Sequence, residues 1–324
     1  MSARFTARPR HLWGMQTILG YGGAIGQPLA TALANHTTHV RCVARSPKTL
    51  PAGEGTHYEM VTADLLDLAS AVRAVAGSRV VYMLVGLPYK TAVWRRDWPV
   101  LIANVIEACA AAGASLVFLD NVYAVDPAAY DGFSETAALR PPSSKGEVRR
   151  AVLEQLTNAS VPVLIARAAD FYGPGIENSL FRELIVKKLA AGSAAQWLGN
   201  ADLPHSFTYT PDAGAALATL GNDPTAYGQT WNLPTSGEAR TVREWTAAVA
   251  RELDVAPKLQ VVPRWLWRLL AYVSGDLREL YDVREQVLRP YVFSSAKFTR
   301  RYGTVATDPP TALAAILATE RTAG

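Results

Sequence analysis

The chain has 324 residues, 49% of them hydrophobic and 19% charged, which allows one large α/β unit or two smaller lobes and excludes a disordered chain. Its net charge of +4, without any run of Lys or Arg, is too small for a protein that binds a phosphate backbone, so no nucleic-acid partner is expected. The only cysteines, Cys42 and Cys109, exclude a disulfide scaffold and a cysteine-based zinc site, and they favour a reducing, cytoplasmic setting.

The first 14 residues form a basic segment that we expect to lie outside the folded domain. Arg4, Arg8 and Arg10 lie there without any acidic residue, so they supply three of the four net charges. The segment lacks an apolar run long enough for a signal-peptide core. Residues 1–14 are therefore predicted to be a basic N-terminal tail, or alternatively an arm that contacts a partner, and the folded body is predicted to be nearly neutral.

Short apolar segments alternate with segments of helical period up to about residue 170. Strands are predicted over 16–20, 39–44, 58–61, 80–85, 115–119 and 162–166, and helices over 24–34, 67–76, 92–112 and 144–157. Apolar strands separated by helices are typical of a parallel sheet covered on both faces. The predicted fold class is α/β, a doubly wound parallel sheet of the Rossmann type.

Beyond residue 170 the alternation weakens, and helices are predicted near 178–191, 211–220, 241–253 and 263–273. We expect a nucleotide-binding domain over 15–170 and a smaller, mainly helical substrate lobe over 171–324. Within that lobe, 206–233 is expected to return to the sheet through strands near 206–210 and 229–233.

The sequence predicts no association with a membrane. No stretch approaches the ~20 apolar residues of a membrane span. The best candidate, from Trp265 to Val273, is short and contains Arg268. Its helical spacing predicts core of the small lobe or an apolar pocket wall rather than a membrane-surface helix.

A glycine-rich turn follows the first predicted strand. Gly20, Gly23 and Gly26 have the spacing GxxGxxG, with Ala24 and Ile25 between the last two. In a strand–turn–helix context, such glycines give a tight turn, let a pyrophosphate approach backbone N–H groups and let the helix pack on the strand. We expect these five residues to bind a dinucleotide.

The end of the second strand indicates which dinucleotide binds. An acid there would bind a ribose 2′-hydroxyl, whereas Arg45 and Ser46 stand there and suit a 2′-phosphate. NADP(H) is therefore favoured over NAD(H), although Arg45 could instead be a solvated surface residue. Asp64 is expected to bond the adenine amino group or to cap the next helix. Three further cofactor contacts are expected after the third and fourth strands, at Leu65, Val85 and Gly86.

These motifs carry a resemblance to a known family. GYGGAIG at 20–26, ADLLD at 63–67, FYGPG at 171–175 and HSFTYTPD at 205–212 resemble an extended short-chain dehydrogenase/reductase, and more narrowly the NAD-dependent epimerase/dehydratase superfamily. The resemblance runs from residue 15 to about 310. It implies a dinucleotide in the N-terminal lobe, a small substrate in the cleft below the C-terminal lobe, and a homodimer formed through helices 92–112 and 144–157.

The family's catalytic triad is incomplete in this sequence. The family uses a Ser or Thr, a Tyr, and a Lys four residues after that Tyr. If Lys145 is the motif's lysine, Pro141 occupies the tyrosine position; in the other register these positions hold Ser143 and Glu147. The fifth strand ends in Asp120-Asn121, without the expected hydroxyl. The chain is thus an atypical member.

Three residues are candidates for the missing acid/base chemistry. Lys145 is the first, and it is also expected to bind the cofactor. As an alternative, Ser144 and Glu147 have capping-box spacing, which would make it an exposed lysine at a helix start. Tyr123 follows the fifth strand, where the nicotinamide should lie, and Tyr172 lies in the loop after the sixth. Either tyrosine could instead be a packed aromatic residue.

Four polar residues are expected to contact the substrate: Asn121, Asp170, Asn178 and His205. A buried pair of Asp170 with Arg167, and a structural hydrogen bond of His205, are the alternatives. The histidines show no metal-ligand spacing with nearby acids, so no metal is expected.

These observations lead to a functional prediction with two alternatives. The first is an NADPH-dependent reductase of a small, fairly apolar carbonyl or conjugated-alkene substrate. The second, suggested by the resemblance, is a sugar-nucleotide epimerase or dehydratase. The third is a non-catalytic NADP-binding regulatory protein, for which missing triad residues would be expected.

Overall fold

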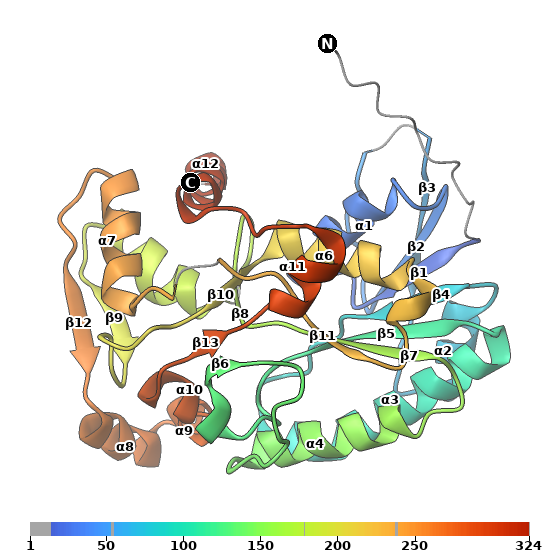
Figure 1. Cartoon of the computed structure of the whole chain (residues 1–324), viewed down its shortest axis with the longest axis horizontal. Coiled ribbons are helices and arrows are strands. Elements are labelled where there is room, and N and C mark those ends of the chain that lie inside the picture. Colours follow the sequence, from blue (N-terminus) through green and yellow to red (C-terminus); the bar gives the residue numbers. More distant parts are fainter. Residues whose placement is uncertain (1–13, 53–54, 178, 237–238, 324) are drawn as a thin grey trace.

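A seven-stranded parallel sheet forms the centre of the molecule, with strand order β11-β7-β5-β4-β1-β2-β3 (Figure 1). The computed structural model describes residues 14–52, 55–177, 179–236 and 239–323. The strands of this sheet are β1 (Gln16–Leu19), β2 (His39–Ala44), β3 (His57–Thr62), β4 (Val80–Met83), β5 (Ser115–Asp120), β7 (Val163–Arg167) and β11 (Thr230–Asn232). β1 and β4 are buried along their whole length, as expected for strands covered on both faces.

Helices cover both faces of the sheet. One face carries α1 (Gly26–Leu33), α6 (Thr210–Gly221) and α11 (Ala296–Tyr302), and the other carries α2 (Leu68–Val75), α3 (Thr91–Ala112) and α4 (Ser144–Thr157). Each layer closes a separate apolar core against the sheet. The doubly wound Rossmann prediction is confirmed.

A second region, formed mainly from residues after 170, lies beside the carboxyl edge of the sheet (Figure 1). Its helical segments are the π-helical turn η2 (Arg182–Val186), α5 (Lys187–Ala190), α7 (Val242–Glu252), α8 (Arg264–Val273), α9 (Gly275–Asp282), α10 (Glu285–Leu288) and α12 (Pro309–Ala323). Two short 3₁₀ helices, η1 (Pro127–Ala129) and η3 (Pro224–Ala226), lie in the connections.

Three two-stranded parallel sheets accompany the central one. They pair β8 (Asp170–Tyr172) with β10 (Phe207–Tyr209), β9 (Ala195–Leu198) with β12 (Leu259–Val262), and β6 (Asp131–Phe133) with β13 (Val292–Phe293). Of the segment 206–233, β11 therefore joins the central sheet beside β7, whereas β10 pairs with β8 instead.

Candidate active site

The glycine-rich turn lies where β1 enters α1. Gly20 has φ of +86°, and a Cβ there would lie 2.8 Å from the Val85 backbone. A Cβ on Gly26 would lie 2.0 Å from the Tyr21 carbonyl oxygen. The nearest neighbour of a Cβ on Gly23 would be the Gly20 carbonyl oxygen at 3.4 Å, which is an ordinary contact. Gly20 and Gly26 are thus required by the fold, whereas Gly23 leaves its exposed face open.

The N-terminus of α1 has the properties of an anion site. Its N-cap residue, Ile25, supplies no side-chain cap, and no acid lies in the first turn. Gly26 donates its N–H to the Gly23 carbonyl at 3.2 Å and Pro28 has no N–H, so within the first turn the Gln27 N–H is left to bind a pyrophosphate, which the helix dipole favours. The predicted cofactor residues Gly20, Gly23, Ala24, Ile25 and Gly26 form this turn, so the local geometry fits the group.

Other predicted cofactor residues follow the neighbouring strands at the same carboxyl edge of the sheet. Arg45 and Ser46 follow β2 and are exposed. Within the described ranges, Arg45 makes no hydrogen bond or ion pair, so its guanidinium is available to a ligand. The Lys48 side chain lies against Gly22, with Cε 3.0 Å from where a Cβ would stand, and brings a second cation beside the turn.

Asp64 and Leu65 follow β3, and Val85 and Gly86 follow β4. Asp64 accepts a hydrogen bond from the Leu66 backbone N–H at 3.0 Å, while Asp67 is the residue that caps α2. The capping alternative for Asp64 is therefore wrong. Leu65 is buried, and Gly86 is exposed beside the Gly20 turn.

Lys145 lies in the first turn of α4, and its side chain is fully buried. The expected capping box is wrong, because Ser143, not Ser144, caps the helix by accepting from the Gly146 N–H at 3.0 Å. The Lys145 ammonium forms an ion pair with Glu279 and donates to the Thr91 hydroxyl at 3.1 Å. It is thus not the exposed lysine that the capping alternative required.

Helix α9 supplies the partners of this helix start. Asp282 accepts from the backbone N–H groups of Ser144 and Lys145 at 3.1 and 3.0 Å. Burial acts to raise the pKa of Glu279, but hydrogen bonds from Lys145 and Thr91 outweigh it and lower that pKa overall. Glu279 is therefore a stable carboxylate, and α9 closes over the N-terminus of α4.

Two tyrosines lie beside Lys145 on the carboxyl side of β4 and β5. The Lys145 Nζ is 4.5 Å from the centre of the Tyr89 ring, and the hydroxyls of Tyr89 and Tyr123 are hydrogen-bonded at 3.0 Å. Asn121 helps to fix this arrangement, since its side chain accepts from the Tyr123 backbone N–H at 3.1 Å. Burial raises the pKa of both phenols, and the negative charge of Asp170 raises both further.

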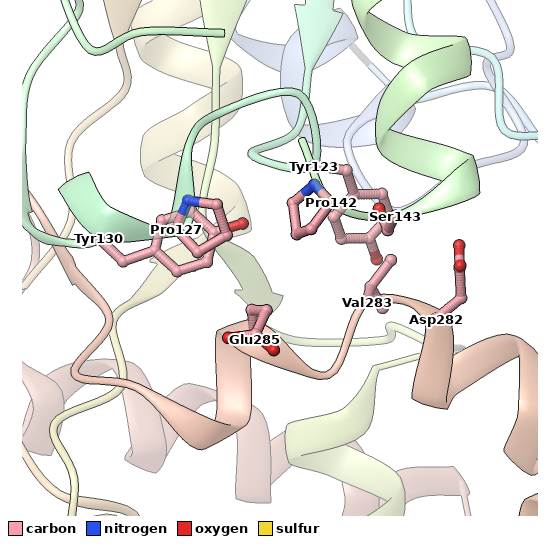
Figure 2. A pocket seen from close by; sticks show the side chains of 8 residues that line it. All are labelled: Tyr123, Pro127, Tyr130, Pro142, Ser143, Asp282, Val283 and Glu285. Atoms are coloured by element: carbon pink, nitrogen blue, oxygen red, sulfur yellow. The ribbon is translucent and has the colours of Figure 1, made fainter. Parts of the chain in front are cut away.

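Tyr123 also lines a pocket. Figure 2 shows Tyr123, Pro142 and Ser143 on one side and Asp282, Val283 and Glu285, which lie between the end of α9 and the start of α10, on the other. The lining residues are Tyr123, Pro127, Tyr130, Pro142, Ser143, Asp282, Val283 and Glu285. Tyr123, a predicted catalytic residue, therefore lies next to the start of α4, the helix that carries Lys145.

The position expected to carry the family's hydroxyl belongs to a buried ion cluster. Asp120 accepts from Arg149 at 2.6 Å and from Arg167 at 3.3 Å, and all three side chains are almost fully buried. The alternative pairing of Arg167 with Asp170 is therefore wrong. Asp120 is engaged on both carboxylate oxygens, which leaves Tyr123 and Asn121 as the polar groups beyond the end of β5.

The predicted substrate residues Asp170 and His205 lie together. His205 is buried, and its Nε2 is 2.8 Å from the Asp170 carboxylate, whose other oxygen accepts from Gln286 at 3.4 Å. Asn178 lies outside the described residues. Tyr172 is packed among aromatic side chains in the apolar core of the second region, with Phe181 and Trp245 each 5.4 Å away between ring centres, rather than beside Lys145.

One histidine cluster was not expected. The ligand atoms of His39, His57 and Glu59, at the start of β2 and β3, lie within 4.8 Å of one another. The Arg41 guanidinium, 2.5 Å from a Glu59 carboxylate oxygen, already balances the only negative charge of this set. The cluster lies at the amino ends of its strands, on the opposite edge from the glycine turn.

Three residues around Lys145 were not singled out from the sequence: Tyr89, Glu279 and Asp282. Tyr89 carried a usable signal, since it follows the strand β4 as Tyr123 follows β5, and adjacent parallel strands end at the same edge. Glu279 and Asp282 carried none, because they come from a helix more than 130 residues away in the chain.

Solved structures with the same fold cover nearly the whole chain. MoeE5 in complex with UDP-glucose and NAD aligns with a TM-score of 0.75 and 21% identity over 96% of this chain and 99% of its own. The UDP-N-acetylglucosamine 4-epimerase from Bacillus cereus gives 0.73 and 17% over 95% and 96%, and the Thermus thermophilus UDP-glucose 4-epimerase complex with NAD gives 0.72 and 17% over 96% and 100%. At this identity they establish the fold. No curated protein matches the chain.

A family model extends the comparison to sequence. The NAD dependent epimerase/dehydratase family matches residues 17–233, more than half of the chain, including the glycine turn, Tyr123 and Lys145. With the nucleotide-sugar enzymes among the structural neighbours, this match overturns the leading prediction of an NADPH-dependent reductase of a small apolar carbonyl or alkene. The chain belongs to the NAD dependent epimerase/dehydratase family.

Proposed function

We propose that this chain is an enzyme that binds a nicotinamide dinucleotide and epimerises or dehydrates a nucleotide sugar. Its family and the UDP-sugar complexes among structures of the same fold support this class of reaction. The observation that carries the proposal is the hydrogen-bonded pair Tyr89–Tyr123, which lies between Lys145 and the pocket that Tyr123 lines.

The residues along the carboxyl edge of the sheet would hold the cofactor. The backbone of the glycine turn would bind the pyrophosphate, and Asp64 the adenine amino group. We infer a preference for NADP(H) over NAD(H), because Arg45, Ser46 and Lys48 offer a phosphate two cations and a hydroxyl, and no acid follows β2. When bound, the nicotinamide would accept a hydride from the sugar and return it.

Tyr123 would exchange the proton of the reacting sugar hydroxyl. Tyr123 lines the pocket, and its hydroxyl is hydrogen-bonded at 3.0 Å to that of Tyr89, which can share the proton. The buried Lys145 ammonium beneath the Tyr89 ring supplies positive charge that favours a phenolate, as the lysine of the family motif would. Burial opposes this by raising the pKa of both phenols, so the reactive form should accumulate only at alkaline pH.

The experiment is to incubate the purified chain with NADP⁺ or NAD⁺ and with UDP-glucose, UDP-N-acetylglucosamine or UDP-glucuronic acid, and to detect epimerised or dehydrated product by proton NMR. We expect turnover that rises with pH through the neutral range, a loss of about 100-fold or more in Tyr123→Phe, and a smaller loss in Tyr89→Phe.

Tyr130→Phe is the matched control, since Tyr130 lines the same pocket. Full activity of Tyr123→Phe would refute the assignment of the acid/base residue. Dinucleotide binding without conversion of any of these nucleotide sugars would refute the proposed reaction.

A further inference from the structure

Helix α8 exposes an apolar face at the edge of the molecule. Trp265, Leu269, Tyr272 and Val273 are 69%, 59%, 69% and 83% exposed, and their i, i+4, i+7, i+8 spacing places them on one side of the helix. The opposite side carries Trp267, which is buried. A contiguous set of large exposed apolar side chains on one helix marks an interaction surface rather than an ordinary solvated face.

The opposite side of α8 is fixed by α9, so the apolar face cannot turn inward. The Trp267 indole donates to the Leu277 carbonyl at 3.3 Å, and its ring lies 5.1 Å from that of Tyr281. The Arg278 guanidinium donates to the Ala271 and Tyr272 carbonyls at 3.1 and 3.0 Å, which satisfies the end of the helix. α8 and α9 form a hairpin at the periphery, below β12 (Figure 1).

The charged residues on α8 and in the segment directly before it are all basic. Arg264 and Arg268 are exposed on α8 itself, and Lys258 is exposed shortly before it. No acidic residue occurs between Asp254 and Asp276 in the sequence. An apolar face rich in Trp and Tyr, flanked by Arg, has the composition of a helix that lies in the plane of a lipid headgroup region.

We propose that α8 binds the surface of an anionic lipid bilayer, with Trp265, Leu269 and Tyr272 inserted among the headgroups and Arg264 and Arg268 on lipid phosphates. Its ten residues are about half the length of a membrane span, and no helix in the described parts of the chain is long and apolar enough to cross a bilayer. The association is therefore peripheral, and it departs from the sequence-based expectation of no membrane contact.

A second copy of the chain fits this face less well. In a symmetric dimer each partner presents the same patch, which would bring Arg264 and Arg268 of both chains around one axis without any acid on α8 to balance them. Lipid phosphates and carboxylates would neutralise the same arginines. The charge on the face therefore favours an anionic surface as its occupant.

The test is co-sedimentation of the full chain with phosphatidylcholine vesicles that contain or lack phosphatidylserine. We expect at least tenfold tighter binding to the anionic vesicles, weakened by added salt. The triple variant Trp265→Ser/Leu269→Ser/Tyr272→Ser should lose binding, and Arg264→Glu/Arg268→Glu should lose the preference for phosphatidylserine. The matched control is Leu139→Ser/Val305→Ser, which removes two exposed apolar side chains elsewhere.

Thermal unfolding of every variant and the mass of the free protein in solution complete the test. Absence of binding to anionic vesicles, or equal binding by the folded triple variant and its control, would overturn the proposal. So would a dimer of the free chain that the triple variant dissociates, because the face would then be covered by a second copy.

Discussion

Lys145 and Glu279 form an ion pair that joins the first turn of α4 to α9 across 134 residues of sequence. Three acidic residues of α9, spaced three residues apart, each bind another part of the molecule. Asp276 binds Lys90, Glu279 binds Lys145, and Asp282 accepts from the first N–H groups of α4. The spacing places all three on one helical face, so α9 fixes the second region of the molecule against the carboxyl edge of the sheet.

Two glycines of the glycine-rich turn are expected to have different roles. Gly26 is needed for stability, and Gly23 is needed for dinucleotide binding. Gly26→Ala would place a Cβ 2.0 Å from the Tyr21 carbonyl, so we expect a clear loss of stability. Gly23→Ala makes only an ordinary contact within the protein, and we expect a near-normal unfolding temperature with at least tenfold weaker dinucleotide binding.

Thermal unfolding and cofactor titration of both variants check this prediction. Unchanged dinucleotide affinity in Gly23→Ala would contradict the position of the pyrophosphate. Equal stability of the two variants would contradict the close approach at Gly26.

The proposed preference for NADP(H) over NAD(H) rests on Arg45. We expect Arg45→Ala to weaken NADPH binding about tenfold or more, because one ionic contact to the 2′-phosphate is lost, and to leave NADH binding nearly unchanged. The control is Arg73→Ala, an exposed arginine in the last turn of α2, away from the strand ends that form the site. Equal losses for both dinucleotides would show that Arg45 does not bind the 2′-phosphate.

The sequence was sufficient for the sheet and the glycine turn because their signals are local. The strand β1 and Gly20 to Gly26 are adjacent in the chain, and the strand pairs of a doubly wound sheet follow from alternation of strand and helix. The same reasoning places Tyr123 directly after β5; that it lies near the start of α4 is a finding of the structure.

The surroundings of Lys145 could not be predicted in this way. Ser143 caps α4 one residue earlier than the S-x-x-E spacing suggests, and the partners of the lysine come from α9, whose acids carry no motif. Tyr172 likewise follows a strand of the central sheet, β7, but it belongs to β8, which pairs with β10, and its ring lies in the apolar core of the second region. These outcomes depend on tertiary packing that no local pattern encodes.

Asp120 stands where the family has a catalytic hydroxyl, and substituting it shows whether its role here is structural. Asp120→Asn would leave two buried arginines without their carboxylate, and we expect a loss of roughly 3–5 kcal/mol in the free energy of unfolding. Asp202→Asn, which breaks the exposed pair with Arg243, should cost far less, because solvent screens that pair. Chemical denaturation checks both, and an Asp120→Asn protein with normal stability would contradict the structural role.

The Lys145–Glu279 pair predicts a pH dependence of stability. The pKa of Glu279 is lowered in the folded chain, so its contribution should be complete above the unfolded glutamate's pKa, about 4.3, and should disappear as the pH falls through the lower folded value. At pH 7 we expect Glu279→Gln to lose about 2 kcal/mol, less than for a fully buried pair, since Glu279 is 19% exposed and glutamine can still accept from Thr91.

The measurement is the free energy of unfolding of the wild-type chain and of Glu279→Gln between pH 3 and pH 8, with Asp276→Asn as the control. Asp276 lies on the same face of α9, but its pair with Lys90 is exposed and screened by solvent, so we expect little change there. The difference between wild type and Glu279→Gln should shrink on acidification below pH 4. A difference that stays constant or grows as the pH falls would contradict a carboxylate stabilised by Lys145, because protonating Glu279 must remove the interaction that the substitution removes.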